Sequence, residues 1–515
     1  MDNIRQRGGS FRRALFSLYS LEKADEFATI LSQLGWEIIA SRETVKLLSK
    51  KGIPVIDVAD FTGVKEDYGF PPTLHPKIEK YLTFSKGPRI DLVYVLPYPL
   101  SVGNDIGGRT LLALAAKGRR IPVMSVSDME KVTKHLKNKK TLPRALREYL
   151  INKANALIAS HYDDLVSNRE TNDLLVGRFQ YTLLNGENPY QIPAHLFSLK
   201  WKDTLSLPDF KQISGERPCF TNLADADSIL QTISLAAEAF KLRYGKAPFI
   251  CICAKHGNPC GMGISWNDAS SAVNKALFGN PRSIWGGEVI VNFNIDDRLA
   301  RLLYKSKRRK EMLNESAWML DVIVAANFSR GALRILGRRR GRKLFENEAL
   351  GKPFLPQVKF AYRFVRGGFL RQPPHDYVLD FKKVNTTGKG LDKQQMDSLI
   401  MAWSVAWSSN HGGNEIALAK DRQLIGVGGG PSTIEAAEIA LQRAESYGHR
   451  VRGGVFAANA FFPFTDAPSI FAEAGLDAGL VPSGGKQEVL VKDYFRKKNL
   501  SMVYVDEPYR GFSRH

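Results

Sequence analysis

The segment with the clearest chemical potential is ICICAKHGNPCGMG, at residues 250–263. Its apolar run ends at Lys255 and His256, and a Gly/Pro-containing loop is predicted to follow. Loops that leave a strand commonly present polar groups to a cleft. A lysine can stabilise a developing oxyanion, and a histidine can accept a proton near neutral pH. A Lys–His pair is a weak signal when taken alone, because a structural role is the commoner one.

Zinc is not expected at this segment. Pro259 and Cys260 begin the Pro-Cys-x-x-Cys pattern of zinc deaminases, which also requires an upstream His-x-Glu. Position 263 is Gly, and no His-x-Glu lies nearby. The second thiol ligand and the His-x-Glu are therefore missing, and we predict a site without metal.

A glycine-rich segment, LIGVGGGPST at residues 424–433, predicts a turn before a helix that begins near Thr433. Such a turn either binds an anion through backbone N–H groups or is a tight turn without a ligand. The dinucleotide pattern G-x-G-x-x-G fails because its third glycine would fall at Pro431.

Two further segments carry candidate groups. AANAFFPFTD, at residues 457–466, contains Phe461, Phe462 and Phe464, which either pack in the core or wall a flat heterocycle. DIGGRTLLALAAK, at residues 105–117, predicts a turn that leads into a helix.

These segments need strands and helices to position them, and the chain alternates between the two patterns. Strands are predicted at residues 13–18, 53–58, 90–96, 121–126, 248–253, 289–291, 322–325 and 415–419, and helices at 225–240 and 432–446. This alternation favours an α/β fold with parallel sheet. A proline-containing stretch at 186–208 marks the main domain boundary.

The composition excludes several classes of protein. With 515 residues, 44% hydrophobic and 24% charged, the chain is typical of a globular protein of about three domains. No apolar run is long enough for a membrane span, and the polar N-terminus predicts no secretory signal. Four cysteines do not make a disulfide framework, so a reduced, cytoplasmic setting is expected.

The formal charge of +21 points to anionic partners, whether nucleic acid, a membrane surface or small anions. Basic clusters at residues 305–310 and 338–343 are either solvated surfaces or an anion-binding patch. Neither cluster contains an aromatic residue, which weakens the case for nucleic acid.

Taken together, these segments resemble a bifunctional purine-biosynthesis family that joins AICAR transformylase to IMP cyclohydrolase. The shared pieces occur in the family's order: ALFS, TLHPKI, DIGG, LAAK, NGENPYQ, KHGNPCG, GGEVIVNFN, IGVGGG, AFFPFTD and the terminal His515. The resemblance implies a methylglyoxal-synthase-like parallel-sheet domain at residues 1–190. It also implies two cytidine-deaminase-like α/β subdomains without zinc, at 191–370 and 371–515, and a homodimer.

The resemblance implies formyl transfer from 10-formyltetrahydrofolate to AICAR. His256 is then the base for the attacking amine, Lys255 assists the tetrahedral intermediate, and Asn414 orients the formyl group. Substrate and folate contacts fall on Asn258, Trp285, Gly286, Gly287, Gly428, Asn459, Phe461, Phe462 and Arg510.

The cyclohydrolase pattern is eroded. Where the family has Ser-Gly-Gly-Thr, this chain has Arg42 and Glu43 in place of the two glycines, which would block close approach of a phosphate. Pro72 stands where the family has its catalytic Lys. The matching positions that remain are Tyr98, Asp105 and Lys117. We expect cyclohydrolase activity to be absent or very weak.

The transformylase pattern is mixed. Leu184 and Ile434 replace arginines of the family, and Leu184 stands where the phosphate-holding Arg is expected. Asn459 replaces an Asp, while Arg510 or Arg514 are possible substitutes for the lost cations. AICAR is therefore bound differently, or the acceptor is another amine, or the chain is a non-catalytic anion- or nucleic-acid-binding homologue. The retained Lys–His–Asn set favours an enzyme.

Overall fold

The computed structural model describes residues 12–64, 72–139, 141–166, 173, 175–199 and 203–513. These divide into an N-terminal unit, Met1–Arg178, and a C-terminal unit, Phe179–His515, each with its own core. Arg514 and His515, which the sequence analysis singled out, lie outside the described residues.

The described part of the N-terminal unit contains a parallel sheet with strand order β3-β2-β1-β4-β5. Its strands are β1 (Arg12–Leu18), β2 (Trp36–Ala40), β3 (Ile56–Asp57), β4 (Leu92–Leu96) and β5 (Ile121–Val123). Seven helices in this part connect or follow them: α1 (Ala24–Gln33), α2 (Arg42–Lys50), α3 (Val58–Thr62), α4 (Pro76–Thr83), α5 (Ile106–Lys117), α6 (Val126–Lys139) and α7 (Arg144–Leu165).

Both faces of this sheet are buried, as the apolar strand sequences predict. Along β1, Phe16 belongs to one hydrophobic cluster and its neighbour Leu15 to another. Along β4, Tyr94 and Val93 divide in the same way. Successive side chains of a strand point to opposite faces, so one cluster lies on each side of the sheet.

One predicted strand is much shorter than expected. Of residues 53–58, only Ile56–Asp57 pair in the sheet. The Asp57 side chain accepts a hydrogen bond of 2.8 Å from the Ala59 backbone N–H and so caps α3, which begins at Val58. The helix cap therefore ends the strand at this point.

The C-terminal unit is built on a mixed sheet. In the described residues its strand order is β16-β21-β20-β19-β17-β18-β10-β9-β11-β12-β13-β8. The strands of its first half are β8 (Lys211–Ser214), β9 (Phe249–Lys255), β10 (Asn258–Ser265), β11 (Glu288–Val291), β12 (Val322–Ala325) and β13 (Lys343–Glu346). Those of its second half are β16 (Thr386–Thr387), β17 (Asn414–Lys420), β18 (Gln423–Gly430), β19 (Val455–Ala458), β20 (Ala478–Pro482) and β21 (Ser501–Val505).

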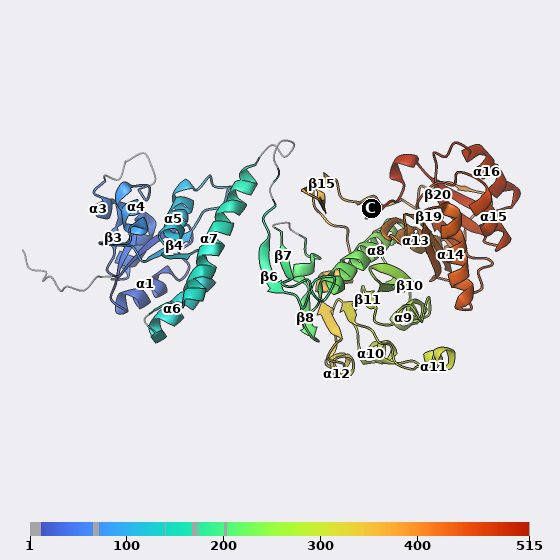
Figure 1. Ribbon diagram of the computed structural model, residues 1–515, viewed down its shortest axis with the longest axis horizontal. Coiled ribbons are helices and arrows are strands. Elements are labelled where there is room, and N and C mark those ends of the chain that lie inside the picture. The colour runs from blue at the N-terminus through green and yellow to red at the C-terminus, as the bar shows by residue number, and fades with distance from the viewer. Residues whose placement is uncertain are drawn as a thin grey trace, which may run out of the picture. The chain divides into compact units, whose positions relative to one another are not determined.

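The two halves repeat one arrangement. A long helix precedes a hairpin in each: α8 (Phe220–Tyr244) precedes β9–β10, and α13 (Lys393–Ser408) precedes β17–β18. Helices α8 and α13 pack together over one face (Figure 1). Strands β10 and β18 are paired, so the two hairpins lie side by side where the halves meet.

The helices of the other face follow the hairpins. Helices α9 (Ala269–Leu277) and α14 (Thr433–Ser446) come directly after β10 and β18. Further helices are α10 (Asp297–Tyr304), α11 (Lys307–Leu313), α12 (Arg330–Leu336), α15 (Asp466–Glu473) and α16 (Glu488–Lys497). Two small hairpins, β6–β7 (Arg178–Thr182 and His195–Ser198) and β14–β15 (Ala361–Val365 and Gly368–Gln372), lie outside the main sheet. No helix of the described residues is long and apolar enough to cross a membrane.

The predicted glycine-rich turn is wrong, because Gly426 to Gly430 form the end of strand β18. A Cβ on Gly426 would lie 2.3 Å from the Ala440 carbonyl oxygen, and one on Gly428 would lie 2.0 Å from that of Ala436. These glycines allow α14 to pack closely against the strand. The predicted start of α14 at Thr433 is correct.

Candidate functional site

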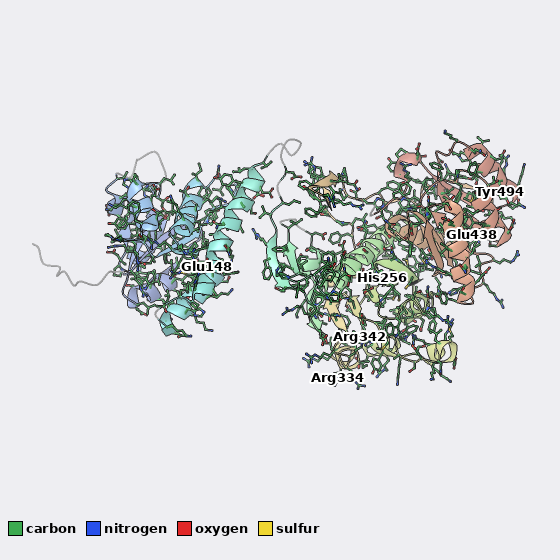
Figure 2. All side chains as sticks on the ribbon, in the orientation of Figure 1. Glu148, His256, Arg334, Arg342, Glu438 and Tyr494 are labelled. Carbon is green, nitrogen blue, oxygen red and sulfur yellow. The ribbon has the colours of Figure 1, made fainter. Side chains whose placement is uncertain are left out.

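Lys255 and His256 lie at the tip of the β9–β10 hairpin. Lys255 ends β9 and pairs with Asn258, so His256 and Gly257 form a two-residue turn. Both have positive φ, 52° and 69°, which is the turn geometry that suits tight hairpins but is uncommon for a non-glycine residue. The His256 side chain is therefore exposed at the junction of the two halves (Figure 2). The prediction of a Gly/Pro loop after His256 is wrong beyond Gly257, because strand β10 begins at Asn258.

A cavity of about 200 Å³ opens beside this turn. It is lined by both hairpins, by the residues that follow α9, by the end of α14 and by the connection before β17. Its cationic and titratable lining side chains include Lys255, His256, His411 and Arg443. The pairing of β10 with β18 thus brings groups from the two halves into one site.

Lys255 is held by the segment that precedes β11. Its Nζ donates a 2.6 Å hydrogen bond to the Gly286 carbonyl oxygen. Gly286 has φ 67°, and a Cβ on Gly287 would lie 2.3 Å from the Ala254 carbonyl oxygen. Both glycines are therefore required for the close approach of this segment to Lys255. The neighbouring Trp285 is exposed.

Acidic side chains lie behind Lys255. Glu288, on β11, is buried, and its burial raises its pKa to about 9, with repulsion from Asp225 acting in the same direction. Glu288 is thus protonated at neutral pH and does not neutralise Lys255. Asp321 is ion-paired with Arg339 at 3.0 Å. Lys255 itself lines the cavity.

The sequence reasoning missed His411, which is part of the cavity wall, and Glu415, which holds it. His411 lines the cavity, and its Nδ1 lies 2.7 Å from the Glu415 carboxylate. Glu415 is buried and also accepts hydrogen bonds from the His411 and Gly412 backbone N–H groups. The signal in the sequence was HGGNE, a His and a Glu four residues apart.

Asn414 takes another position. Its Nδ2 donates to the carbonyl oxygens of Gly430 (3.1 Å) and Pro431 (2.9 Å). It does not line the cavity and instead fixes the connection from β18 to α14, in whose first turn Ile434 lies. By contrast, Asn258 lines the cavity, and its Oδ1 accepts from the Asn410 N–H at 2.9 Å.

Asn459 is a buried support of the same wall. Its Oδ1 accepts from the Glu415 N–H at 2.8 Å, and its Nδ2 donates to the Gly413 carbonyl oxygen at 3.0 Å. It therefore positions the segment that carries His411.

The aromatic segment divides between core and surface. Phe462 is buried against other rings, Phe461 is half-buried and Phe464 is exposed. Arg510 is exposed, with its guanidinium 5.4 Å from the Phe512 ring. Leu184, where the family's Arg is expected, is 57% exposed.

The predicted cyclohydrolase residues are not all brought together. The Tyr98 hydroxyl donates to the Asn104 carbonyl oxygen at 3.4 Å, and the neighbouring Asp105 caps α5 by accepting from Gly108 at 2.7 Å. Lys117 is exposed at the other end of α5, about 18 Å away for a 12-residue helix.

The basic clusters are only partly solvated. Arg309 and Arg342 are buried, so the interpretation as solvated surfaces is wrong for these two side chains. Arg309 pairs with Glu315 at 2.9 Å, and Arg342 donates to the carbonyl oxygens of Trp318 and Leu320. In the described residues, no group of three or more His, Cys, Asp or Glu is placed to hold a metal ion.

Comparisons with known proteins give a consistent assignment. The family model of the AICARFT/IMPCHase bienzyme matches residues 116–443, and that of the MGS-like domain matches residues 23–125. The bifunctional purine biosynthesis protein PurH of Petrotoga mobilis is 30% identical over 96% of this chain and 98% of its own. The PurH of Aquifex aeolicus is 29% identical, with the same coverage. A crystal structure of ForH is 28% identical, covers 31% of this chain and 98% of its own, and gives a TM-score of 0.28.

Proposed function

Because the chain belongs to the AICARFT/IMPCHase bienzyme family, we propose that it is a folate-dependent formyltransferase. The formyl group moves from 10-formyltetrahydrofolate to an amine, by default the 5-amino group of AICAR, and the product is FAICAR. The observation that carries this proposal is the presence of Lys255, His256, Asn258 and His411 around one cavity.

The roles follow from the chemistry of amine formylation. The attacking amine must lose a proton, and we assign its acceptance to the exposed imidazole of His256. Negative charge develops on the formyl oxygen, and the Lys255 ammonium stabilises it. The Gly286 carbonyl takes one N–H of Lys255 and leaves the others for substrate. Asn414 orients the formyl group only indirectly, through the β18–α14 connection.

Within this proposal the cyclohydrolase step is absent or very weak. Arg42 and Glu43 occupy the first turn of α2, where the family has its two glycines. Pro72 replaces the catalytic Lys. These replacements support loss of ring closure while the transfer site is retained. A homodimer is proposed from the resemblance alone, and sedimentation equilibrium tests it.

The experiment incubates the purified protein with 10-formyltetrahydrofolate and AICAR and measures tetrahydrofolate release and IMP separately. We expect tetrahydrofolate and FAICAR without IMP. His256→Ala should lower transfer by about 10²–10⁴-fold, whereas His135→Ala, on α6, should leave it unchanged. Full activity in His256→Ala would contradict the assignment of the base. IMP formation alongside transfer would contradict loss of the cyclohydrolase.

A second candidate is formyl transfer to a different amine. The exposed Leu184 in place of the expected phosphate-binding Arg favours it. Tight folate binding without turnover of AICAR would support this candidate, and a panel of primary amines with and without a phosphate group would then identify the acceptor class. Lack of folate binding would favour a non-catalytic anion-binding homologue instead.

A further inference from the structure

A second cavity, of about 140 Å³, lies at the amino edge of the parallel sheet in the N-terminal unit. Arg12, Trp36 and Ile121 line it, and they are the first residues of β1, β2 and β5. Tyr98 and Asp105 follow the carboxyl end of β4, so they lie at the opposite edge of the sheet. This cavity is therefore separate from the cyclohydrolase-type positions.

The lining is strongly cationic. Five arginines and one acid, Asp91, contribute to it; the arginines are Arg12, Arg89, Arg119, Arg120 and Arg147. The Asp91 carboxylate is already engaged by the Arg89 guanidinium at 2.7 Å and by the Arg13 N–H at 3.2 Å. Arg119 pairs with Glu148, which Figure 2 labels on α7. Asp91 and Glu148 pair with Arg89 and Arg119, so Arg120 and Arg147 add positive charge to the cavity beyond these pairs.

Arg120 and Arg147 lie close together, and both are partly buried. The Arg120 Nε donates to the Leu82 carbonyl oxygen at 2.7 Å, and burial lowers the pKa of Arg120, with the charges of Arg89 and Arg147 acting in the same direction. In the described part of the chain, the buried Nε of Arg147 has no hydrogen-bond partner. Clustering of like charges and an unpaired buried donor are both unfavourable without an anion.

We propose that this arginine cavity binds the phosphoryl group of a small phosphorylated molecule or of free phosphate. A guanidinium group can donate paired hydrogen bonds to two oxygens of a phosphoryl group. A phosphoryl dianion also neutralises more of the positive charge in the cavity than a single carboxylate would. The small volume favours a small anion over a polymer. Trp36 is buried, and the Arg12 guanidinium lies 5.7 Å from the centre of the Trp36 ring. The ring is therefore not open to a stacked base.

This inference does not rest on the formyltransferase proposal, because the Lys255 cavity belongs to the C-terminal unit. The proposed ligand of the N-terminal unit also does not depend on the cyclohydrolase residues that this chain has lost.

The test uses the full chain labelled with 5-fluorotryptophan, in phosphate-free buffer, with the Trp36 resonance assigned by Trp36→Phe. Inorganic phosphate, pyrophosphate and ribose 5-phosphate are titrated separately, and the three arms distinguish free phosphate from an organic phosphate. We expect a saturable shift of the Trp36 signal with at least one of them. In Arg89→Gln/Arg147→Gln the affinity should fall at least about tenfold, as expected for loss of charged hydrogen bonds.

A charge-matched control separates this site from general electrostatics. Lys46→Gln/Lys50→Gln, on α2, removes two positive charges elsewhere in the same unit and should leave the affinity unchanged. Arg147→Lys keeps the charge but loses the paired geometry, and it should weaken binding by less than the double variant. An unshifted Trp36 signal with all three anions would overturn the proposal. Equal affinity in the double variant, or a shift with duplex DNA only, would overturn it as well.

Discussion

The Nδ1 atom of His411 lies 2.7 Å from Oε2 of the buried Glu415, and His411 lines the same cavity as Lys255. The carboxylate fixes the orientation of the ring, and with Nδ1–H donating to it, Nε2 is the nitrogen available to the cavity. A second oriented imidazole therefore stands in the same cavity as His256.

Replacement of His411 tests its contribution. We expect His411→Gln to lower kcat for formyl transfer by about 10–10²-fold, because the substrate loses an oriented polar contact. The melting temperature should change little, since the side chain partly faces the cavity. Steady-state kinetics with both substrates measures the effect. An unchanged kcat would show that His411 only supports the wall.

Glu288 makes the stability depend on pH. Its folded pKa is raised from 4.5 to about 9, so between these values the folded state binds a proton that the unfolded state has lost. The free energy of unfolding should therefore fall by about 1.4 kcal/mol per pH unit as the pH rises through this window. Glu288→Gln should remove the dependence and be the more stable protein at pH 8.

Urea denaturation at pH 5 and pH 8 measures this effect. Glu438→Gln, on the exposed surface of α14 (Figure 2), is the control and should behave like the unsubstituted protein. If Glu288→Gln and the unsubstituted protein show the same pH dependence, Glu288 is ionised in the folded state.

The close packing of α14 on β18 predicts a large effect for a small substitution. In Gly428→Ala the new methyl group would lie 2.0 Å from the Ala436 carbonyl oxygen. We expect destabilisation by about 1–3 kcal/mol or more, because backbone must move to relieve the overlap. Gly390→Ala has open space around it and should be close to neutral. Thermal unfolding compares the midpoint temperatures of the two variants. Equal midpoints would show that α14 shifts to accommodate the methyl group at little cost.

Two arginines in the same part of the chain should differ sharply. Arg342 is buried, donates to three carbonyl oxygens, and burial lowers its pKa to about 10, whereas Arg334 on α12 is exposed (Figure 2). Arg342→Met leaves these acceptors unpaired and should cost about 3 kcal/mol or more. Arg334→Met should change the free energy of unfolding by less than about 0.5 kcal/mol. Similar values for the two variants would contradict a structural role for Arg342.

Much of the fold was predictable because its signals are local. Apolar runs such as residues 322–325 and the helical spacing at 432–446 depend on neighbouring side chains, and the structure confirms both elements. The prediction failed at Gly426–Gly430, since a glycine that permits close packing and one that permits a turn look alike in sequence. Which of the two applies depends on the distance to α14, a contact between elements.

The sequence by itself determined the family, through the order of its short motifs, and it predicted Lys255 and His256 as the reactive pair. Only the tertiary structure decided what surrounds them. His411 joins the pair because β10 and β18 are adjacent strands, and the arginine cavity forms because parallel strands begin at one edge of a sheet. Strand order results from burial summed over the whole unit, so no local pattern specifies it.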